Sequence, residues 1–132
     1  MPEAVLDASA VLAILRGEAG AEEAGAEEAG RYLAAGAISA VNAAEVVSRL
    51  IDFGVAPEIA AGAVRGLDLA ITPLDAPMAL EAGILRRSTR AHGLSLGDRA
   101  CLATAKVLGL PAVTADRAWA SLDLGVEVVL IR

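Results

Sequence analysis

The sequence reads Val5-Leu6-Asp7-Ala8-Ser9 near its amino terminus, and this stretch joins a short buried strand to an apolar helix. The residues Ala4–Leu6 predict the strand, and Ala10–Leu15 predict the helix, which Gly17 ends. A strand followed at once by a helix is typical of a parallel sheet. An aspartate directly after such a strand lies on the sheet edge where ligands bind. Asp7 is therefore the first candidate for a functional side chain.

The same alternation of strands and helices continues along the chain. Further strands are predicted at Ala37–Ser39, Leu67–Thr72, Ala112–Thr114 and Val126–Ile131. Further helices are predicted at Glu18–Gly36, which contains a five-residue tandem repeat, and at Asn42–Phe53, Pro57–Val64, Pro77–His92, Leu96–Leu108 and Asp116–Ser121. The pattern predicts an α/β fold, a three-layer α/β/α sandwich with a short parallel sheet covered on both faces. We expect a single domain over residues 1–132, since no linker interrupts the pattern.

Composition limits the classes of function that the chain can have. Its 56% hydrophobic content with 2% aromatic residues predicts a core of Ala, Val, Leu and Ile. The formal net charge of −6 means that a polyanion would need a local basic patch or a metal ion to bind. The single cysteine, Cys101, excludes an intramolecular disulfide and is expected to be buried. No signal peptide and no apolar stretch of about 20 residues is visible, so we expect a soluble, cytoplasmic protein without membrane association.

Four acidic residues stand in apolar sequence beside a predicted strand end or helix start: Asp7, Glu45, Asp98 and Asp116. Asp7 and Asp116 follow strands, while Glu45 and Asp98 lie in the first turns of helices that can reach the same sheet edge. Two carboxylates about 4 Å apart repel by roughly 4 kcal/mol at an effective dielectric of about 20, so a cluster of four favours a bound cation. Oxygen ligands without a histidine or cysteine cluster indicate Mg²⁺ or Mn²⁺ rather than zinc.

Each acid also has a purely structural interpretation as a helix cap. Asp7 and Asp116 directly precede helices, and two segments have the spacing of a capping box, Asn42-x-x-Glu45 and Ser95-x-x-Asp98. An acid at a helix amino terminus is favourable by about 0.3–1 kcal/mol in any case. Capping alone does not require the four acids to face one edge of the sheet, and for that reason the joint pattern favours a site.

Four segments, in order along the chain, resemble the motifs of PIN-domain ribonucleases of the VapC toxin type. The matching segments are Val5–Ala10, Ile38–Val46, Gly93–Ala100 and Val113–Trp119. The resemblance covers the whole chain and implies a PIN-like fold and a metal-dependent endoribonuclease that hydrolyses structured RNA, with Mg²⁺ (or Mn²⁺) as cofactor. It implies Asp7 and Asp98 as primary metal ligands, with Glu45 and Asp116 completing the catalytic acidic site. It also implies a homodimer, and a VapB-type antitoxin that blocks the site in a type II toxin–antitoxin pair.

Neighbours of the four acids supply two further sets of candidates. Hydroxyl and amide side chains are expected to hold the carboxylates in position as a supporting shell, and these are Ser9, Asn42 and Thr114. Arg99 and Arg117 directly follow Asp98 and Asp116, and we expect them to contact the RNA substrate or an antitoxin carboxylate. Few aromatic residues are present, so phosphate contacts and shape should dominate RNA recognition over base stacking.

Other functions fit the sequence less well. An aspartyl phosphotransferase commonly has a second aspartate two residues after the first, where this chain has Ser9. No Gly-x-Gly-x-x-Gly follows the first strand, which disfavours dinucleotide binding. A receiver-type signalling domain needs a lysine at its last strand, whereas Lys106, the only lysine, lies in a predicted helix. One non-enzymatic alternative stays open, a catalytically weak regulatory module that binds nucleic acid and an antitoxin.

Overall fold

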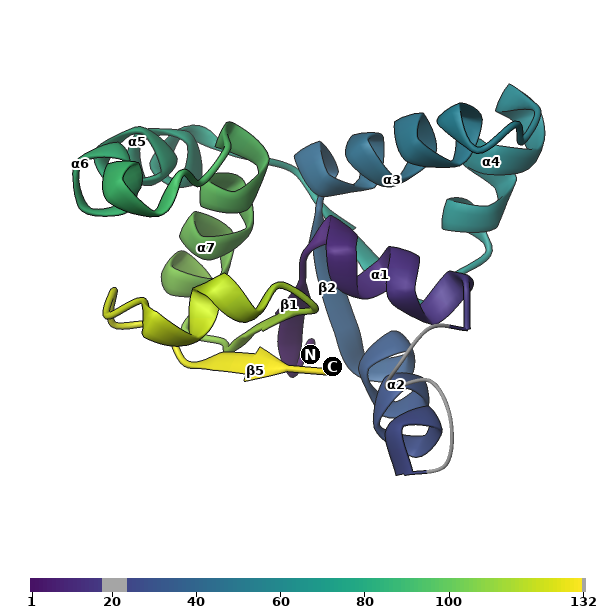
Figure 1. Ribbon diagram of the computed structural model, residues 1–132, viewed down its shortest axis with the longest axis horizontal. Helices are drawn as coiled ribbons and strands as arrows, with labels where there is room; N and C mark the ends of the chain where they lie inside the picture. The colour runs from purple at the N-terminus through teal and green to yellow at the C-terminus, as the bar shows by residue number, and fades with distance from the viewer. Residues whose placement is uncertain (18–23, 132) are drawn as a thin grey trace.

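A five-stranded parallel sheet forms the centre of the computed structural model, which describes residues 1–17 and 24–131. The strand order is β3-β2-β1-β4-β5, and every neighbouring pair is parallel (Figure 1). The strands are β1 (Ala4–Leu6), β2 (Gly36–Ser39), β3 (Ala70–Thr72), β4 (Ala112–Thr114) and β5 (Val128–Leu130). The predicted fold class, an α/β sandwich with a short parallel sheet, is confirmed.

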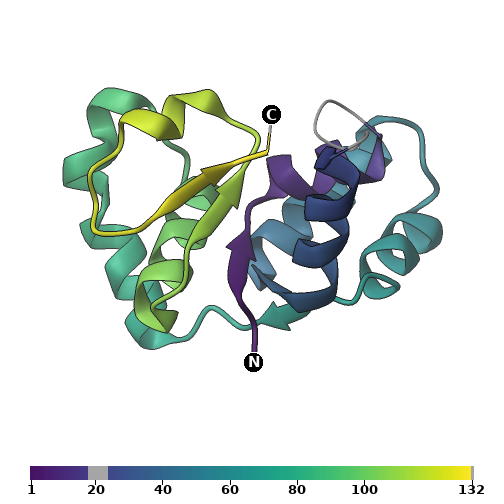
Figure 2. The ribbon, with the colours of Figure 1, turned by 90° about the horizontal axis from the view of Figure 1, so that it is seen from below.

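Helices cover both faces of the sheet and form two separate hydrophobic cores. The first core is built by α1 (Ala8–Leu15), α2 (Ala24–Ala35), α3 (Ala40–Asp52) and α4 (Pro57–Arg65). The second core is built chiefly by α5 (Ala76–Ile84) and α7 (Leu96–Leu108). Leu6 packs in the first core and its neighbour Val5 in the second, because successive residues of a strand point to opposite faces. Figure 2 shows these two groups of helices on opposite sides of β1.

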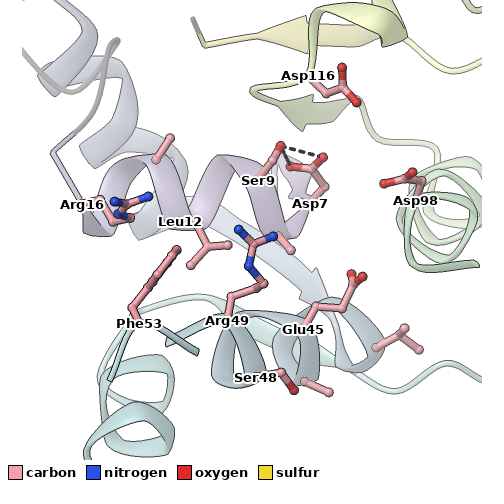
Figure 3. Close-up of a pocket in the computed structure, with 14 residues that line it drawn as sticks. Asp7, Ser9, Leu12, Arg16, Glu45, Ser48, Arg49, Phe53, Asp98 and Asp116 are labelled. Carbon is pink, nitrogen blue, oxygen red and sulfur yellow. Dashed lines mark hydrogen bonds between the residues drawn. The ribbon is translucent and has the colours of Figure 1, made fainter. Parts of the chain in front are cut away.

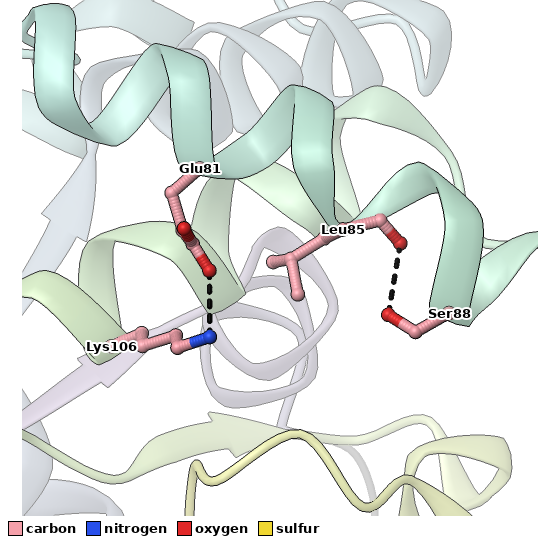
Figure 4. A network of polar contacts seen from close by, with 4 residues as sticks. All are labelled: Glu81, Leu85, Ser88 and Lys106. Atoms are coloured by element: carbon pink, nitrogen blue, oxygen red, sulfur yellow. Dashed lines mark hydrogen bonds and ion pairs between the residues drawn. The ribbon is translucent and has the colours of Figure 1, made fainter.

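The segment predicted as one helix over Pro77–His92 is divided, and that prediction was wrong. The structure has α5, then α6 (Arg86–Thr89) and a 3₁₀ turn (Arg90–His92). The hydroxyls of Ser88 and Thr89 both donate to the carbonyl oxygen of Leu85, at 3.3 and 2.7 Å, and such local bonds compete with regular helix hydrogen bonding. Figure 4 shows the bond from Ser88. An ion pair of 2.7 Å between Lys106 and Glu81 joins α7 to α5 nearby.

Smaller differences concern the ends of elements. The first helix begins at Ala8 rather than Ala10, and β3 is shorter than the predicted strand Leu67–Thr72. The predicted helix Glu18–Gly36 corresponds to α2, while residues 18–23, which include part of the tandem repeat, lie outside the described residues. Arg117–Ser121 forms a 3₁₀ helix, at the place where a short helix was predicted. In the described part of the chain, no helix is both long and apolar enough to cross a membrane.

The centre of the sheet is the point where the strand order reverses. β1 pairs with β2 on one side and with β4 on the other, and Leu6 lies opposite Val113. The backbone N–H of Asp7 donates to the carbonyl oxygen of Val113 at 3.0 Å, so the segments after β1 and β4 leave the sheet side by side. In open α/β sheets, ligands bind beyond the carboxyl ends of the strands at such a reversal.

Candidate active site

A cavity of about 620 Å³ opens at this edge of the sheet, and all four predicted acids line it (Figure 3). Asp7 follows β1, Glu45 comes from α3, Asp98 from the first turn of α7, and Asp116 from the segment after β4. The remaining lining is provided mainly by α1 and α3. Four segments that are far apart in the sequence therefore present carboxylates to one space.

Asp7 is the most deeply held of the four acids. Its side chain is buried, and it caps α1 by accepting a hydrogen bond of 2.8 Å from the backbone N–H of Ala10. The hydroxyl of Thr114 donates to Oδ2 at 2.6 Å, and the hydroxyl of Ser9 lies 2.8 and 2.9 Å from the two carboxylate oxygens. Ser9 and Thr114 are in turn held by the backbone N–H groups of the segment after β4. The carboxylate of Asp7 is thus fixed in direction by groups from α1 and from β4.

Burial raises the pKa of Asp7 from 3.8 to about 6, because the ionised form loses contact with water. Hydrogen bonds from Thr114, Ala10 and Ser9 act in the opposite direction, and the charge of Asp98 raises the pKa further. The two carboxylates are therefore close enough to repel. A cation bound between them would favour the ionised form of both.

The donor set in this cavity fits a hard divalent cation. It consists of carboxylate oxygens, which Mg²⁺ and Mn²⁺ prefer. Among residues 1–17 and 24–131, no three acidic, histidine or cysteine side chains already form a cage around one point. Mg²⁺ usually binds one or two carboxylates and keeps several waters, so it does not require a complete protein cage.

Glu45 is placed by a contact between α3 and α7. The buried amide of Asn42 donates to Glu45 Oε1 at 2.7 Å and to the carbonyl oxygen of Gly97 at 3.0 Å. A Cβ atom at Gly97 would overlap the Glu45 carboxylate, so Glu45 can keep its present position only beside a glycine. The capping-box interpretation of Asn42 was wrong, because Ser39 caps α3 through a hydrogen bond from Val41.

Asp98 and Asp116 are helix caps as well as cavity residues. Ser95 and Asp98 form a reciprocal capping box at the start of α7, as the spacing predicted. Asp116 Oδ1 accepts from the backbone N–H of Ala118 at 2.9 Å. Each cap uses one oxygen of its carboxylate, so capping and a role in the site are compatible. The catalytic assignment of the four acids stays a prediction.

The two arginines predicted to contact substrate or antitoxin do not line the cavity. The guanidinium of Arg99 donates to the carbonyl oxygen of Ala82 at 2.9 Å and so ties α7 to α5, while Arg117 is exposed on the 3₁₀ helix. The positively charged residues in the cavity lining are Arg16 and Arg49. Sequence reasoning missed both, although Arg49 lies four residues after Glu45, a spacing that places both on one helix face.

Comparison with known proteins identifies the fold of this chain. The family model described as PIN domain matches residues 4–124. A DNA-bound VapBC from Salmonella typhimurium is 20% identical, covers 100% of both chains and has a TM-score of 0.76. VapC20 from Mycobacterium tuberculosis, described as a Sarcin-Ricin loop cleaving toxin, is 20% identical over 95% of this chain and 99% of that chain, with a TM-score of 0.67. VapBC-5 from the same organism is 24% identical over 98% and 99%, with a TM-score of 0.63.

At these identities the solved structures establish a shared fold. Among curated proteins, none matches this sequence.

Proposed function

This chain belongs to the PIN-domain family, whose model spans residues 4–124, and from that premise we propose that it is a metal-dependent endoribonuclease. It would hydrolyse phosphodiester bonds in structured RNA as the toxin of a type II toxin–antitoxin pair. The observation that carries this proposal is the meeting of four carboxylates from four segments in one cavity at the reversal point of the sheet. Oxygen donors without a nucleophile–base pair favour hydrolysis by a water molecule.

Asp7 and Asp98 would hold Mg²⁺ or Mn²⁺, with Glu45 and Asp116 completing the acidic site. When bound, such a metal ion lowers the pKa of water and neutralises charge on the phosphate. Glu45, oriented by Asn42, would accept a hydrogen bond from the attacking water.

The groups around the acids support hydrolysis by water rather than a covalent step. Ser9 and Thr114 keep the Asp7 carboxylate in one orientation, and this limits the reorganisation needed when substrate binds. Cys101 is fully buried, and burial raises the pKa of its thiol well above the usual range, so it is unsuited to act as a nucleophile.

The partners that we propose are a VapB-type antitoxin and a second copy of this chain, in the cytoplasm. Solved toxin–antitoxin complexes with the same fold support the antitoxin. Arg117 is exposed beside Asp116, so it remains our candidate for contact with RNA or an antitoxin carboxylate. Arg99 is a weaker candidate, because its guanidinium is hydrogen-bonded to the backbone of α5.

The decisive experiment is to sequence the RNA ends that the purified chain produces with Mg²⁺ or Mn²⁺. Discrete new ends that disappear when EDTA is added would support the proposal. The competing hypothesis, a catalytically weak module that binds nucleic acid and an antitoxin, predicts bound RNA that stays intact.

Millimolar Mn²⁺ should raise the melting temperature of the chain by several degrees. A ligand that binds only the folded state at a hundred times its Kd stabilises it by about 2.7 kcal/mol. Thermal unfolding with Mn²⁺ and with EDTA measures the shift, and the Asp98→Asn variant serves as the control in which the shift should be much reduced. An equal shift in both proteins would place the ion elsewhere.

Replacing Gly97 by alanine should lower RNA cleavage by about tenfold or more, the range expected when a supporting contact of a metal site is lost. The added Cβ would overlap the Glu45 carboxylate and force it away from Asn42. Gly62→Ala in α4 is the matched control, because a Cβ there meets nothing within 4 Å. The control should keep full cleavage and gain up to about 1 kcal/mol of stability. Equal cleavage by both variants would remove Glu45 from the mechanism.

A further inference from the structure

The cavity has a second end with a different chemistry. Beyond the four acids, its walls carry Arg16, at the end of α1, and Arg49 and Phe53, at the end of α3 (Figure 3). We call these three residues the arginine–phenylalanine cluster. The guanidinium carbon of Arg16 lies 4.4 Å from the centre of the Phe53 ring, and that of Arg49 lies 5.5 Å from it. One aromatic ring therefore orients two cationic side chains in the same cavity as the acids.

The spacing along α3 connects the cluster to the acidic end. Glu45, Arg49 and Phe53 follow one another at intervals of four residues, so they occupy one face of the helix. At 1.5 Å per residue, Arg49 lies about 6 Å and Phe53 about 12 Å along the helix axis from Glu45. These are distances that a nucleic-acid strand covers within a few nucleotides.

The way in which Arg49 is held preserves its positive charge. An aromatic ring attracts a guanidinium without supplying the negative charge that a carboxylate partner would bring. Lys106, by contrast, is paired with the carboxylate of Glu81. Phe53 is 45% exposed, whereas the other two aromatic residues, Tyr32 and Trp119, are buried in the cores. An exposed phenylalanine beside Arg49 has a use if that arginine faces a ligand.

An RNA substrate needs such a site on this protein. The chain carries a formal net charge of −6, and the four carboxylates at one end of the cavity repel a polyanion. Arginine has a planar fork of donors that matches phosphate oxygens. We propose that Arg49, oriented by the ring of Phe53, binds an RNA backbone phosphate adjacent to the bond that is cleaved. This inference rests on the proposed function and specifies how that site holds its substrate.

The test measures RNA affinity separately from cleavage. In an Asp98→Asn background, which removes cleavage, the binding of a fluorescently labelled RNA stem-loop is measured by anisotropy over a series of salt concentrations. Losing one phosphate contact reduces the slope of log K against log salt by about 0.7–0.9. We expect Arg49→Gln to show that reduction, together with a several-fold higher Kd. Arg65→Gln, which removes the same charge from the exposed end of α4, should change neither quantity beyond the general effect of net charge.

A second pair of variants tests the role of the ring. Phe53→Leu keeps both arginines, so the slope of log K against log salt should not change. The Kd should rise by about two- to fivefold, which is the effect expected from losing an exposed cation–π contact. Phe53→Tyr should restore the affinity.

Three results would overturn the proposal: equal effects of Arg49→Gln and Arg65→Gln, a Phe53→Leu variant with unchanged affinity, or Arg49→Gln weakening only the binding of an antitoxin. If the Arg49 effect appears but no RNA is ever cleaved, the subsite stands and the nuclease assignment fails. If RNA is cleaved but Arg49→Gln changes neither the salt slope nor the Kd, the nuclease assignment stands and the subsite fails.

Discussion

Replacing Asp98 with asparagine should abolish RNA cleavage, lowering its rate by at least about a hundredfold, and leave the fold intact. The asparagine keeps the size of the side chain and an oxygen that can accept the capping hydrogen bond from the backbone N–H of Ser95. It removes the negative charge of a carboxylate that would be a ligand of the divalent cation. Preorganised charge at the reacting phosphate contributes several kcal/mol in metal-dependent hydrolysis, which sets the size of the expected loss.

The matched control for this variant is Asp75→Asn. Asp75 also caps a helix, α5, by accepting a hydrogen bond of 3.0 Å from the backbone N–H of Met78, but it does not line the cavity. If Asp98 were only a cap, the two variants would behave alike in cleavage assays. Rates are measured on the same RNA with Mn²⁺, and circular dichroism verifies folding. Undiminished cleavage by pure Asp98→Asn protein would refute the mechanism.

Asp7→Asn should stabilise the metal-free chain at neutral pH while it abolishes cleavage. The folded state raises the pKa of Asp7 from 3.8 to about 6, so ionised Asp7 destabilises the fold. That difference corresponds to roughly 3 kcal/mol. Asparagine carries no charge to desolvate, and its oxygen can still accept from the N–H of Ala10. Part of the gain will be offset by rearrangement of the Ser9 and Thr114 hydroxyls.

The stability of the wild-type chain should change with pH in a direction that follows from the raised pKa of Asp7. Because the folded pKa lies above the unfolded value, the wild-type chain loses stability as pH rises from about 4 to about 6, and the loss is complete above that range. The stability difference between Asp7→Asn and wild type should therefore be small near pH 4 and reach roughly 2–3 kcal/mol at about pH 7. Urea unfolding in EDTA measures this stability difference.

Saturating Mn²⁺ should reverse the order of stability of the two proteins, since only the wild type can bind the ion well. A variant less stable than wild type at neutral pH in EDTA would contradict the burial argument.

The sequence predicted the placement of the acids better than that of the arginines, and the reason is geometric. Asp7 and Asp116 follow strands of a parallel sheet, so the alternation of elements places both at one edge. Arg99 was chosen because it follows Asp98, yet neighbours in a helix point about 100° apart, and its guanidinium reaches α5 instead. Arg49 follows Glu45 by four residues, which is the helical spacing that places two side chains together.

Other features depended on tertiary contacts that no local pattern reveals. The space that Gly97 leaves for Glu45 exists only because α3 packs against α7, and a lone glycine in a helix start gives no hint of that. The division of the predicted helix Pro77–His92 is accompanied by bonds from the hydroxyls of Ser88 and Thr89 to the carbonyl oxygen of Leu85. Arg16 and Phe53 meet because α1 and α3 end beside one another, which follows from the packing of two helices and not from either sequence alone.

The pairing of β1 with β4 also has a consequence for biosynthesis. The carboxylate of Asp7 is held by the hydroxyl of Thr114, which is 107 residues further along the chain, and Asp116 follows two residues later. A nascent chain therefore cannot assemble the acidic site until β4 and the segment after it have left the ribosome. Translation that stops before β4 yields a fragment without Thr114 and Asp116, and a cell that makes such fragments is not exposed to the assembled site.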